Sequence, residues 1–196
     1  MTLLAQCLAD PVLDSQAVFR LALAALSRPG HKQALPPSLA LDHSDLPSAA
    51  AALLVTLCDY ETPLFLENAL SAARPWLAFH TGAPEAKEPE NAMFAVATAA
   101  GATALLKRLP IGDDRYPDQS ATLLILCDSL EGGDAVTLEG PGIETRLTIA
   151  PQGPGADFWD AARDNAALYP LGVDMVFVAG RDFIGLPRST HIEGAR

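Results

Sequence analysis

The feature of this sequence that most limits its fold is the apolar run Ala121–Cys127, which only Thr122 interrupts. The run has the length of one strand, and a strand that is apolar on both faces belongs inside a sheet that is covered on both sides. A loop rich in turn residues, Gly112–Asp118, precedes it. We therefore predict a central strand here, with helices packed against the sheet.

Two helices are predicted near the start of the chain. The first begins at a cap formed by Asp14 or Ser15 and runs to about Ser27, with Val18, Phe19, Ala22, Leu23 and Leu26 at helical spacing. The pair Pro29-Gly30 then stops it.

The second helix has Ser44 or Asp45 as its cap, Pro47 in its first turn and an almost wholly apolar body over Ala50–Leu57. A helix that is apolar on every side is a buried helix, so we expect it to lie against the sheet.

The remaining elements alternate between the two types. We predict strands at His31–Leu35, Leu64–Leu66, Phe94–Val96, Ala135–Leu138, Arg146–Ile149, Met175–Ala179 and Phe183–Leu186. We predict helices at Leu70–Phe79, which Arg74-Pro75 kinks or divides into two, and at Gly101–Leu109 and Ala156–Leu168. The fold class is thus α/β, with a mixed β-sheet flanked by helices, and residues 1–196 form a single domain.

Charge and hydropathy exclude several kinds of partner. The formal net charge is −11 and no run of basic residues is present, so we expect no nucleic acid partner, because binding phosphates requires clustered Lys and Arg. No segment has the apolar length of a membrane span, and residues 1–11 carry Asp10 and no basic residue, which is unlike a secretory signal. We expect a soluble, cytoplasmic protein, in which Cys7, Cys58 and Cys127 remain reduced.

Motifs for the common cofactors are missing from the sequence. There is no phosphate-binding loop, dinucleotide fingerprint, HExxH or CxxC pattern, and the four histidines have no metal-ligand spacing. A pyridoxal phosphate Schiff base needs a lysine in a desolvated pocket, and neither Lys32, Lys87 nor Lys107 is placed for one. We therefore expect no bound cofactor and no metal.

Three short segments have both a structural and a functional interpretation. Gly140-Pro141-Gly142 is a phosphate loop or, more in keeping with its place between two strands, a hairpin loop. Phe79–Gly82 ends a helix, where His80 meets the helix dipole or binds a ligand. Pro187–His191 groups a guanidinium, two hydroxyls and an imidazole, which suits a phosphate, a partner's carboxylate or a solvated tail anchored by Arg188.

Six segments together resemble the H subunit of the bacterial carbon–phosphorus lyase system, the PhnH family. They are Leu26–Gly30, Thr56–Asp59 with Glu61–Pro63, Phe79–Pro84, Leu138–Ile143, Tyr169–Asp174 and Pro187–His191. The resemblance extends from Phe19 to His191, and its specificity lies in the ordered set and not in any single piece.

The resemblance implies a role in using phosphonates as a phosphorus source. Members of the family assemble with the G, I and J subunits into a core complex, and the machinery exchanges the adenine of ATP for a phosphonate to give an alkylphosphonate ribose triphosphate. It also implies a fold like a reduced large domain of pyridoxal phosphate transferases, without the cofactor. The lysine positions agree with that loss.

The family supplies no catalytic set for this subunit, so we assign no catalytic residue. Five residues have chemistry suited to holding a ligand or a partner, and they are Arg28, His80, Asp174, Arg188 and His191.

Two functions remain open at this point. The leading hypothesis is a subunit that scaffolds or shapes a partner's active site. The alternative is an independent small-molecule enzyme with a degenerate transferase-type pocket at the carboxyl end of the sheet. A closed pocket in which Arg188, His191 and a carboxylate converge would favour the enzyme.

Apolar surface also predicts self-association. Hydrophobic residues make up 49% of the chain, and Leu3, Leu4 and Leu8 in the segment Thr2–Leu8 have no obvious core partner. We expect a homodimer when the chain is alone, because a single self-complementary patch is enough to form one.

Overall fold

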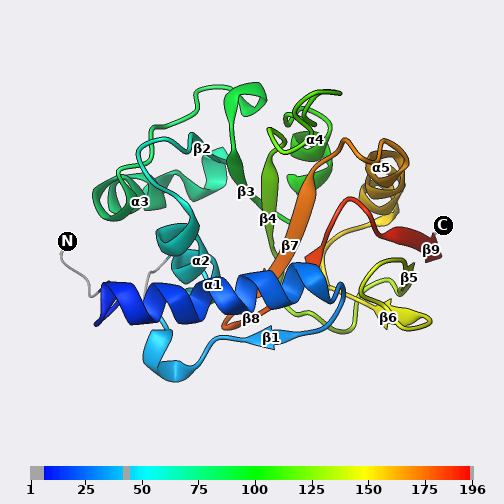
Figure 1. The fold of residues 1–196 in the computed structure, drawn as a ribbon, viewed down its shortest axis with the longest axis horizontal. Helices are drawn as coiled ribbons and strands as arrows, with labels where there is room; N and C mark the ends of the chain where they lie inside the picture. The colour runs from blue at the N-terminus through cyan, green and yellow to red at the C-terminus, as the bar shows by residue number, and fades with distance from the viewer. Residues whose placement is uncertain (1–6, 42–44, 195–196) are drawn as a thin grey trace.

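The computed structural model describes residues 7–41 and 45–194 and contains one α/β domain. Its main sheet has six strands in the order β1-β8-β7-β4-β3-β2, and a second sheet has three in the order β6-β5-β9 (Figure 1). The strands are β1 (Gln33–Ala34), β2 (Leu64–Leu66), β3 (Phe94–Thr98), β4 (Thr122–Leu126), β5 (Val136–Glu139), β6 (Leu147–Ile149), β7 (Asp174–Ala179), β8 (Asp182–Leu186) and β9 (His191–Gly194). The helices are α1 (Pro11–Ser27), α2 (Ser48–Leu57), α3 (Arg74–Thr81), α4 (Ala102–Leu106) and α5 (Ala156–Ala167), with short 3-10 turns at Pro37–Leu39, Asn68–Ala73 and Pro89–Asn91.

The apolar run predicted to be central forms β4, which lies between β3 and β7. Strands β2, β3, β4 and β7 are parallel, and β8 returns antiparallel beside β7. The main sheet is therefore mixed, as predicted. Leu123, Leu124 and Ile125 are at most 1% exposed, because helices cover both faces of the sheet.

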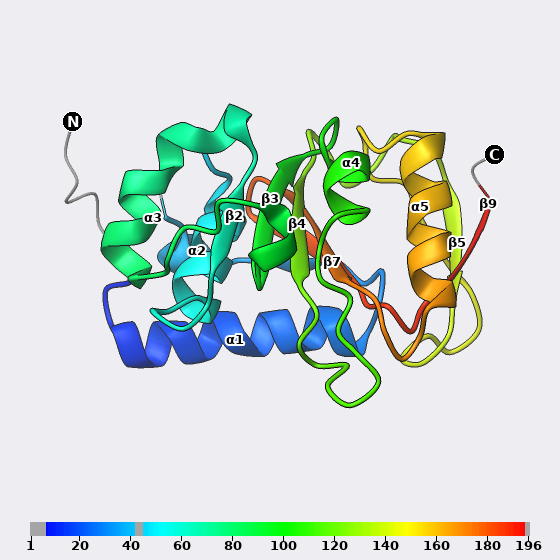
Figure 2. The same cartoon turned by 90° about the horizontal axis from the view of Figure 1, so that it is seen from above.

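Alternate residues of the central strands face two separate cores. Val96, Leu124 and Val176 belong to a core shared with α1, α2 and α3, whereas Ala97, Ile125 and Phe177 belong to one shared with α4, α5 and the small sheet. Figure 2 shows α1 on one side of the main sheet and α4 and α5 on the other.

Helix α1 begins earlier than predicted. Its N-cap is Asp10, whose carboxylate accepts hydrogen bonds from the backbone N–H groups of Val12 and Leu13 at 3.1 and 3.0 Å. Neither predicted cap, Asp14 or Ser15, is the N-cap, and Asp14 instead accepts a bond from the N–H of Asp10 at 2.9 Å. The prediction was wrong because Asp10 caps a helix whose first residue is Pro11, a residue that suits the first helical position. The predicted end at Ser27 is confirmed.

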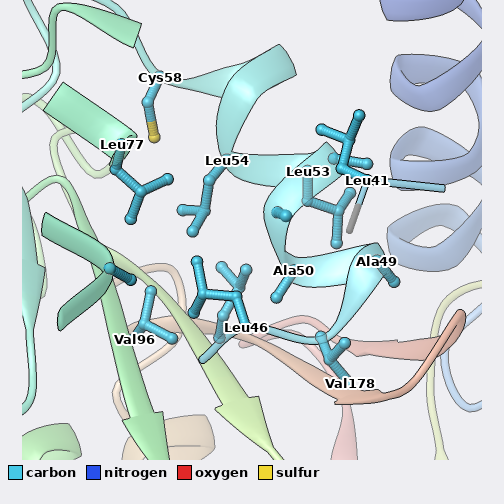
Figure 3. Packing of buried hydrophobic residues seen from close by; sticks show 14 of the residues in the cluster. Leu41, Leu46, Ala49, Ala50, Leu53, Leu54, Cys58, Leu77, Val96 and Val178 are labelled. Atoms are coloured by element: carbon cyan, nitrogen blue, oxygen red, sulfur yellow. The ribbon is translucent and has the colours of Figure 1, made fainter. Parts of the chain in front are cut away.

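Helix α2 is buried nearly all round, as predicted. Ala49, Ala50, Ala51, Ala52, Leu53 and Leu54 are at most 2% exposed. Figure 3 shows Leu54 on the side of α2 nearest Leu77, and Ala49 on the side nearest α1. The predicted cap Ser44 lies outside the described residues, and Asp45 is not the cap, because the helix begins directly after Pro47.

The chain divides at Arg74, where a 3-10 turn ends and α3 begins, so the prediction of two shorter helices is confirmed. Gly82 follows α3 in the left-handed conformation that a helix C-cap favours.

The small sheet corrects the predicted chain end. The hairpin of β5 and β6 is confirmed, with Leu138 opposite Leu147. Pro187–His191 is not a solvated tail, however, because the chain continues into β9, which pairs antiparallel with β5 and places Ile192 opposite Leu138. A four-residue strand with Ile192 as its one large apolar residue has no periodicity of its own and depends on the partner strand.

No helix within residues 7–41 and 45–194 is both long and apolar enough to cross a membrane.

Candidate functional site

Asp174 and Arg188 are brought together by the β7–β8 pair. Asp174 begins β7 and Arg188 follows the end of β8, so an antiparallel hairpin places them side by side. Nη2 and Nε of Arg188 lie 2.8 and 3.2 Å from the two carboxylate oxygens of Asp174, and the Arg188 backbone N–H donates to the same carboxylate at 2.9 Å. Nη1 of Arg188 donates to the carbonyl of Pro117 at 2.6 Å.

This pair has the geometry of a structural clamp. The guanidinium bonds two carboxylate oxygens and one carbonyl, and the side chains of Arg188 and Asp174 are only 17% and 21% exposed. The pair lies where the parallel strands begin, whereas open α/β sheets bind ligands where those strands end. It fastens the loop at Pro117 to the start of β7 and the exit of β8.

Arg28 and His191 are both exposed, and they border the Gly140–Gly142 loop from two sides. A Cβ built on Gly142 would overlap the carbonyl oxygen of Ser27, the residue before Arg28. A Cβ built on Gly140 would lie 3.1 Å from the carbonyl oxygen of Ser189. The loop therefore closes against backbone on both sides, which is the role of a tightly packed hairpin loop and not of a phosphate loop.

Four of the six segments that carry the family resemblance meet around this loop. Leu26–Gly30 and Pro187–His191 flank it, and Tyr169–Asp174 is joined to the second of them through Asp174 and Arg188. They form the junction between the main sheet and the small sheet (Figure 1). We call these segments, with Leu138–Ile143, the sheet junction. The contacts at the sheet junction are mostly close approaches to backbone atoms of neighbouring segments.

The other two segments meet elsewhere in the molecule. Leu64, which directly follows Glu61–Pro63, donates its N–H to the carbonyl of Pro84 at 2.9 Å. Tyr60, which lies between the two parts of the other segment, is beside Gly82. His80 is in this second group, so the structure does not join it to the other four candidates.

His80 packs against aromatic rings. Its ring centroid is 4.5 Å from that of Trp76 and 5.0 Å from that of Phe79. Burial lowers the pKa of the imidazole, a shift opposite in direction to the one that a helix dipole would cause. His80 therefore packs against these two rings, in surroundings that favour its neutral form.

Side chains of the protein itself occupy part of the edge where an α/β fold would hold a ligand. Glu67 directly follows β2, and its carboxylate accepts bonds from the backbone N–H and the hydroxyl of Thr98 at 2.7 and 2.8 Å. Thr98 ends β3, so this carboxylate ties together the ends of two parallel strands. No sequence pattern indicates this pair, because Glu67 and Thr98 are 31 residues apart along the chain.

The lysines and cysteines lie as the sequence predicted. Lys87 and Lys107 are exposed, and Lys32 is half exposed and pairs with Asp182 at 3.7 Å. Cys58 and Cys127 are buried, and burial raises the pKa of each thiol to about 12, so neither is a ready nucleophile. Within the part of the chain that the structure describes, no group of His, Cys, Asp and Glu side chains is arranged to hold a metal ion.

Four surface grooves have cavity volumes between about 180 and 330 Å³, and none of the five candidate residues lines any of these four. The first, of about 270 Å³, contains Arg74, whose Nη1 is already paired with Glu85 at 2.6 Å. The converging pocket that would favour an independent enzyme is thus not among them.

The most apolar groove, of about 180 Å³, lies between α1, α2 and the main sheet, and Phe19, Leu23 and Leu57 help to line it. Phe19 and Leu23, two of the residues whose helical spacing predicted helix α1, are 50% and 57% exposed. Val12 and Leu13 on the same helix are also exposed, at 77% and 63%. The sequence signal for this exposure is that α1 has apolar residues on several sides, not all of which can face the core.

Comparison with known proteins identifies the family of the chain. Residues 6–193 match the model of the family described as bacterial phosphonate metabolism protein (PhnH). The chain belongs to this family. It is 37% identical, over 94% of its length and 93% of the relative's, to the Rhizobium meliloti protein named alpha-D-ribose 1-methylphosphonate 5-triphosphate synthase subunit PhnH. It is also 34% identical, over 45% of its length and 46% of the relative's, to a Stutzerimonas stutzeri protein named putative C-P lyase subunit protein HtxG. The PhnH match thus covers the main sheet, the small sheet and the junction between them.

Proposed function

We propose that this chain is a subunit of ribose 1-methylphosphonate 5-triphosphate synthase in phosphonate metabolism, and that it supports the reaction without an active site of its own. The observation that carries the first part is the 37% identity to a subunit of that name over nearly the full length of both chains. The G, I and J subunits of the carbon–phosphorus lyase complex are the partners we infer for it.

The contacts of the candidate residues support the absence of an independent active site. Of the two arginines among them, Arg188 is the more buried, and its guanidinium is engaged by Asp174 and Pro117. A triphosphate substrate would also approach a chain of net charge −11 against electrostatic repulsion. Both facts favour a scaffolding role over catalysis by this chain.

We also infer that the domain is a reduced form of the large domain of pyridoxal phosphate transferases. Support comes from the parallel core of β2, β3, β4 and β7, which β8 extends antiparallel. None of the three lysines is buried, so the chain has no group suited to a Schiff base with the cofactor.

We propose further that the chain alone is a homodimer. The predicted surface was Thr2–Leu8, of which residues 1–6 lie outside the described residues, whereas Leu8 is 8% exposed and packs in the core. The better candidate surface is the groove beside α1, because its lining contains no charged residue and Phe19 and Leu23 project from it. A second copy meets no charge repulsion at this groove.

Replacing Leu23 by aspartate is therefore expected to separate the dimer, because the variant would bury a carboxylate in an apolar contact. Sedimentation velocity at micromolar concentration should give a dimer for the natural chain and a monomer for Leu23→Asp. Leu168→Asp, which changes an exposed leucine at the end of α5, on the other side of the main sheet from α1, is the control and should remain a dimer. A monomeric natural chain would contradict the proposal, as would a dimeric Leu23→Asp.

Omission of the chain tests the proposed function. The partner subunits, supplied with ATP and methylphosphonate, should form the ribose triphosphate product only when this chain is added. Equal product formation with and without the chain would refute the role.

A further inference from the structure

The groove of about 270 Å³ combines an arginine with apolar walls, and it lies outside the sheet junction. Part of its lining comes from β2, which is at one edge of the main sheet (Figure 1), and part comes from α3. The rest comes from Ala83 and Glu85. Ala83 belongs to Phe79–Pro84, one of the six segments that carry the family resemblance. We call this groove the α3–β2 groove.

Most of the lining of the α3–β2 groove is apolar. Three of its residues are buried apolar side chains: Leu64, Leu66 and Ala83 are 5%, 3% and 9% exposed. Its two charged side chains are those of Arg74 and Glu85, which form an ion pair with each other. A ligand that fits this groove therefore has an apolar body and one charged end.

Arg74 is fixed at the edge of the main sheet. It begins α3, and its Nη2 donates to the carbonyl of Leu66 at 3.2 Å. The N–H of Glu67 donates to the carbonyl of Val96 in β3 at 3.0 Å. The backbone groups of Leu66, the residue before Glu67, therefore point away from β3, because successive residues of a strand alternate in direction. The Arg74 guanidinium thus covers the outer edge of β2 at Leu66.

The Arg74 guanidinium has donors to spare. An arginine carries five N–H donors. Nη1 is paired with Glu85 at 2.6 Å, Nη2 donates to Leu66, and Nε is buried without a partner among the described residues. Arg188 differs, because its Nε and both of its Nη nitrogens are engaged. The Arg74 side chain is 34% exposed and lines the groove, so a ligand there has access to the guanidinium.

Glu85 holds the place of an anionic ligand on Arg74. Its side chain is 55% exposed, and exposed ion pairs are weak, so another anion can replace its carboxylate. The residues on either side of Glu85 fix its backbone, because the N–H of Leu64 donates to Pro84 at 2.9 Å and that of Ala86 donates to Leu64 at 3.0 Å. The Glu85 side chain can therefore turn into solvent while the wall of the groove stays in place.

We propose that the α3–β2 groove binds a small molecule with one anionic group on a short alkyl chain, and that this molecule is an alkylphosphonate. Its oxygens replace the Glu85 carboxylate on Arg74, where a guanidinium can donate two parallel bonds. Its alkyl chain contacts Leu64 and Leu66. The choice of a phosphonate rests on the proposed function, because a synthase of a ribose methylphosphonate handles such a substrate. One phosphonate carries less charge than a triphosphate, so the net charge of −11 opposes it less.

Titration calorimetry with the purified full-length chain tests the alkyl contact. The probes are butylphosphonate, methylphosphonate and inorganic phosphate at one ionic strength. Each added methylene should tighten binding by up to about fourfold, the effect of burying one such group. Butylphosphonate should therefore bind most tightly and inorganic phosphate most weakly. Equal affinities for the three probes would contradict the proposed apolar contact.

Two substitutions test the anionic contact in opposite directions. Arg74→Gln should weaken the binding of butylphosphonate at least about tenfold, because hydrogen bonds to a charged group are lost. Glu85→Gln should tighten it, because the competing charge is removed and the shape of the side chain is kept. A gain in affinity cannot result from a damaged fold. Glu90→Gln and Arg108→Gln make the same charge changes in an exposed ion pair outside the four grooves, and both should bind like the natural chain.

The groove proposal is wrong if butylphosphonate binds neither the natural chain nor Glu85→Gln, or if Arg74→Gln leaves the affinity unchanged. Omission of the chain from the synthase reaction tests the proposed function separately. If the chain is required for product formation but binds no alkylphosphonate, only the groove proposal fails. If the chain binds butylphosphonate through Arg74 but product forms equally well without it, the proposed function fails.

Discussion

Gly142→Ala is expected to destabilise the folded protein by about 2–5 kcal/mol, the sum of backbone strain and overpacking. Gly142 has a φ of +84°, which side chains other than hydrogen rarely permit. The added Cβ would overlap the carbonyl oxygen of Ser27 and lie 2.9 Å from Cδ of Pro29. To relieve this overlap, the end of α1 would have to move away from the hairpin loop. That movement would open the sheet junction.

Gly132→Ala provides a matched control. Gly132 has a nearly equal φ of +90°, but no atom lies within 4 Å of the added Cβ. This variant should lose only the strain contribution, about 1 kcal/mol. Urea unfolding of both variants at one protein concentration measures the difference. Equal losses would show that the junction is not closely packed at Gly142.

Asp174→Ala is expected to cost about 3 kcal/mol, near the lower end of the range for breaking a largely buried ion pair. The loss arises because the Arg188 guanidinium would stay largely buried with only the Pro117 carbonyl as its partner. In a domain of this size the melting temperature should fall by about 6–12 °C.

Asp160→Ala is the control for Asp174→Ala, because Asp160 also pairs with an arginine, Arg163, but is 68% exposed. It should cost less than about 1 kcal/mol. If Asp174→Ala is no more destabilising than Asp160→Ala but abolishes the activity of the assembled complex, then Asp174 contacts a ligand or a partner and is not a clamp.

The layered core was predictable because its signals are local. The burial of the apolar run at Thr122–Leu126 and of the apolar helix Ser48–Leu57 can each be predicted from a few consecutive residues. The hairpins were predictable for the same reason, since Gly180 and the Gly140–Gly142 loop separate strand-like segments. Strand β9 was not, because its pairing with β5 joins segments about fifty residues apart.

The contacts of the candidate residues could not be predicted from the sequence. The chemistry of Asp174 and Arg188 suggested that they contact a ligand or a partner, but only the β7–β8 pairing reveals that they bind each other. The exposure of Phe19 and Leu23 could not be predicted from helical spacing, for a related reason. Helical spacing shows that residues share a face, but not whether another element covers that face.

We propose that this chain serves a synthase without catalysing the reaction itself, and adenine release from ATP is the sharpest test of that role. The purified chain, free of other subunits, is incubated with ATP and methylphosphonate, and adenine is measured by chromatography over many potential turnovers. We predict no adenine above the background without protein, and release only when the partner subunits are added to the chain. Sustained adenine release by the chain alone would contradict the account, because it would require an active site that the clamp at Arg188 and the four grooves do not provide.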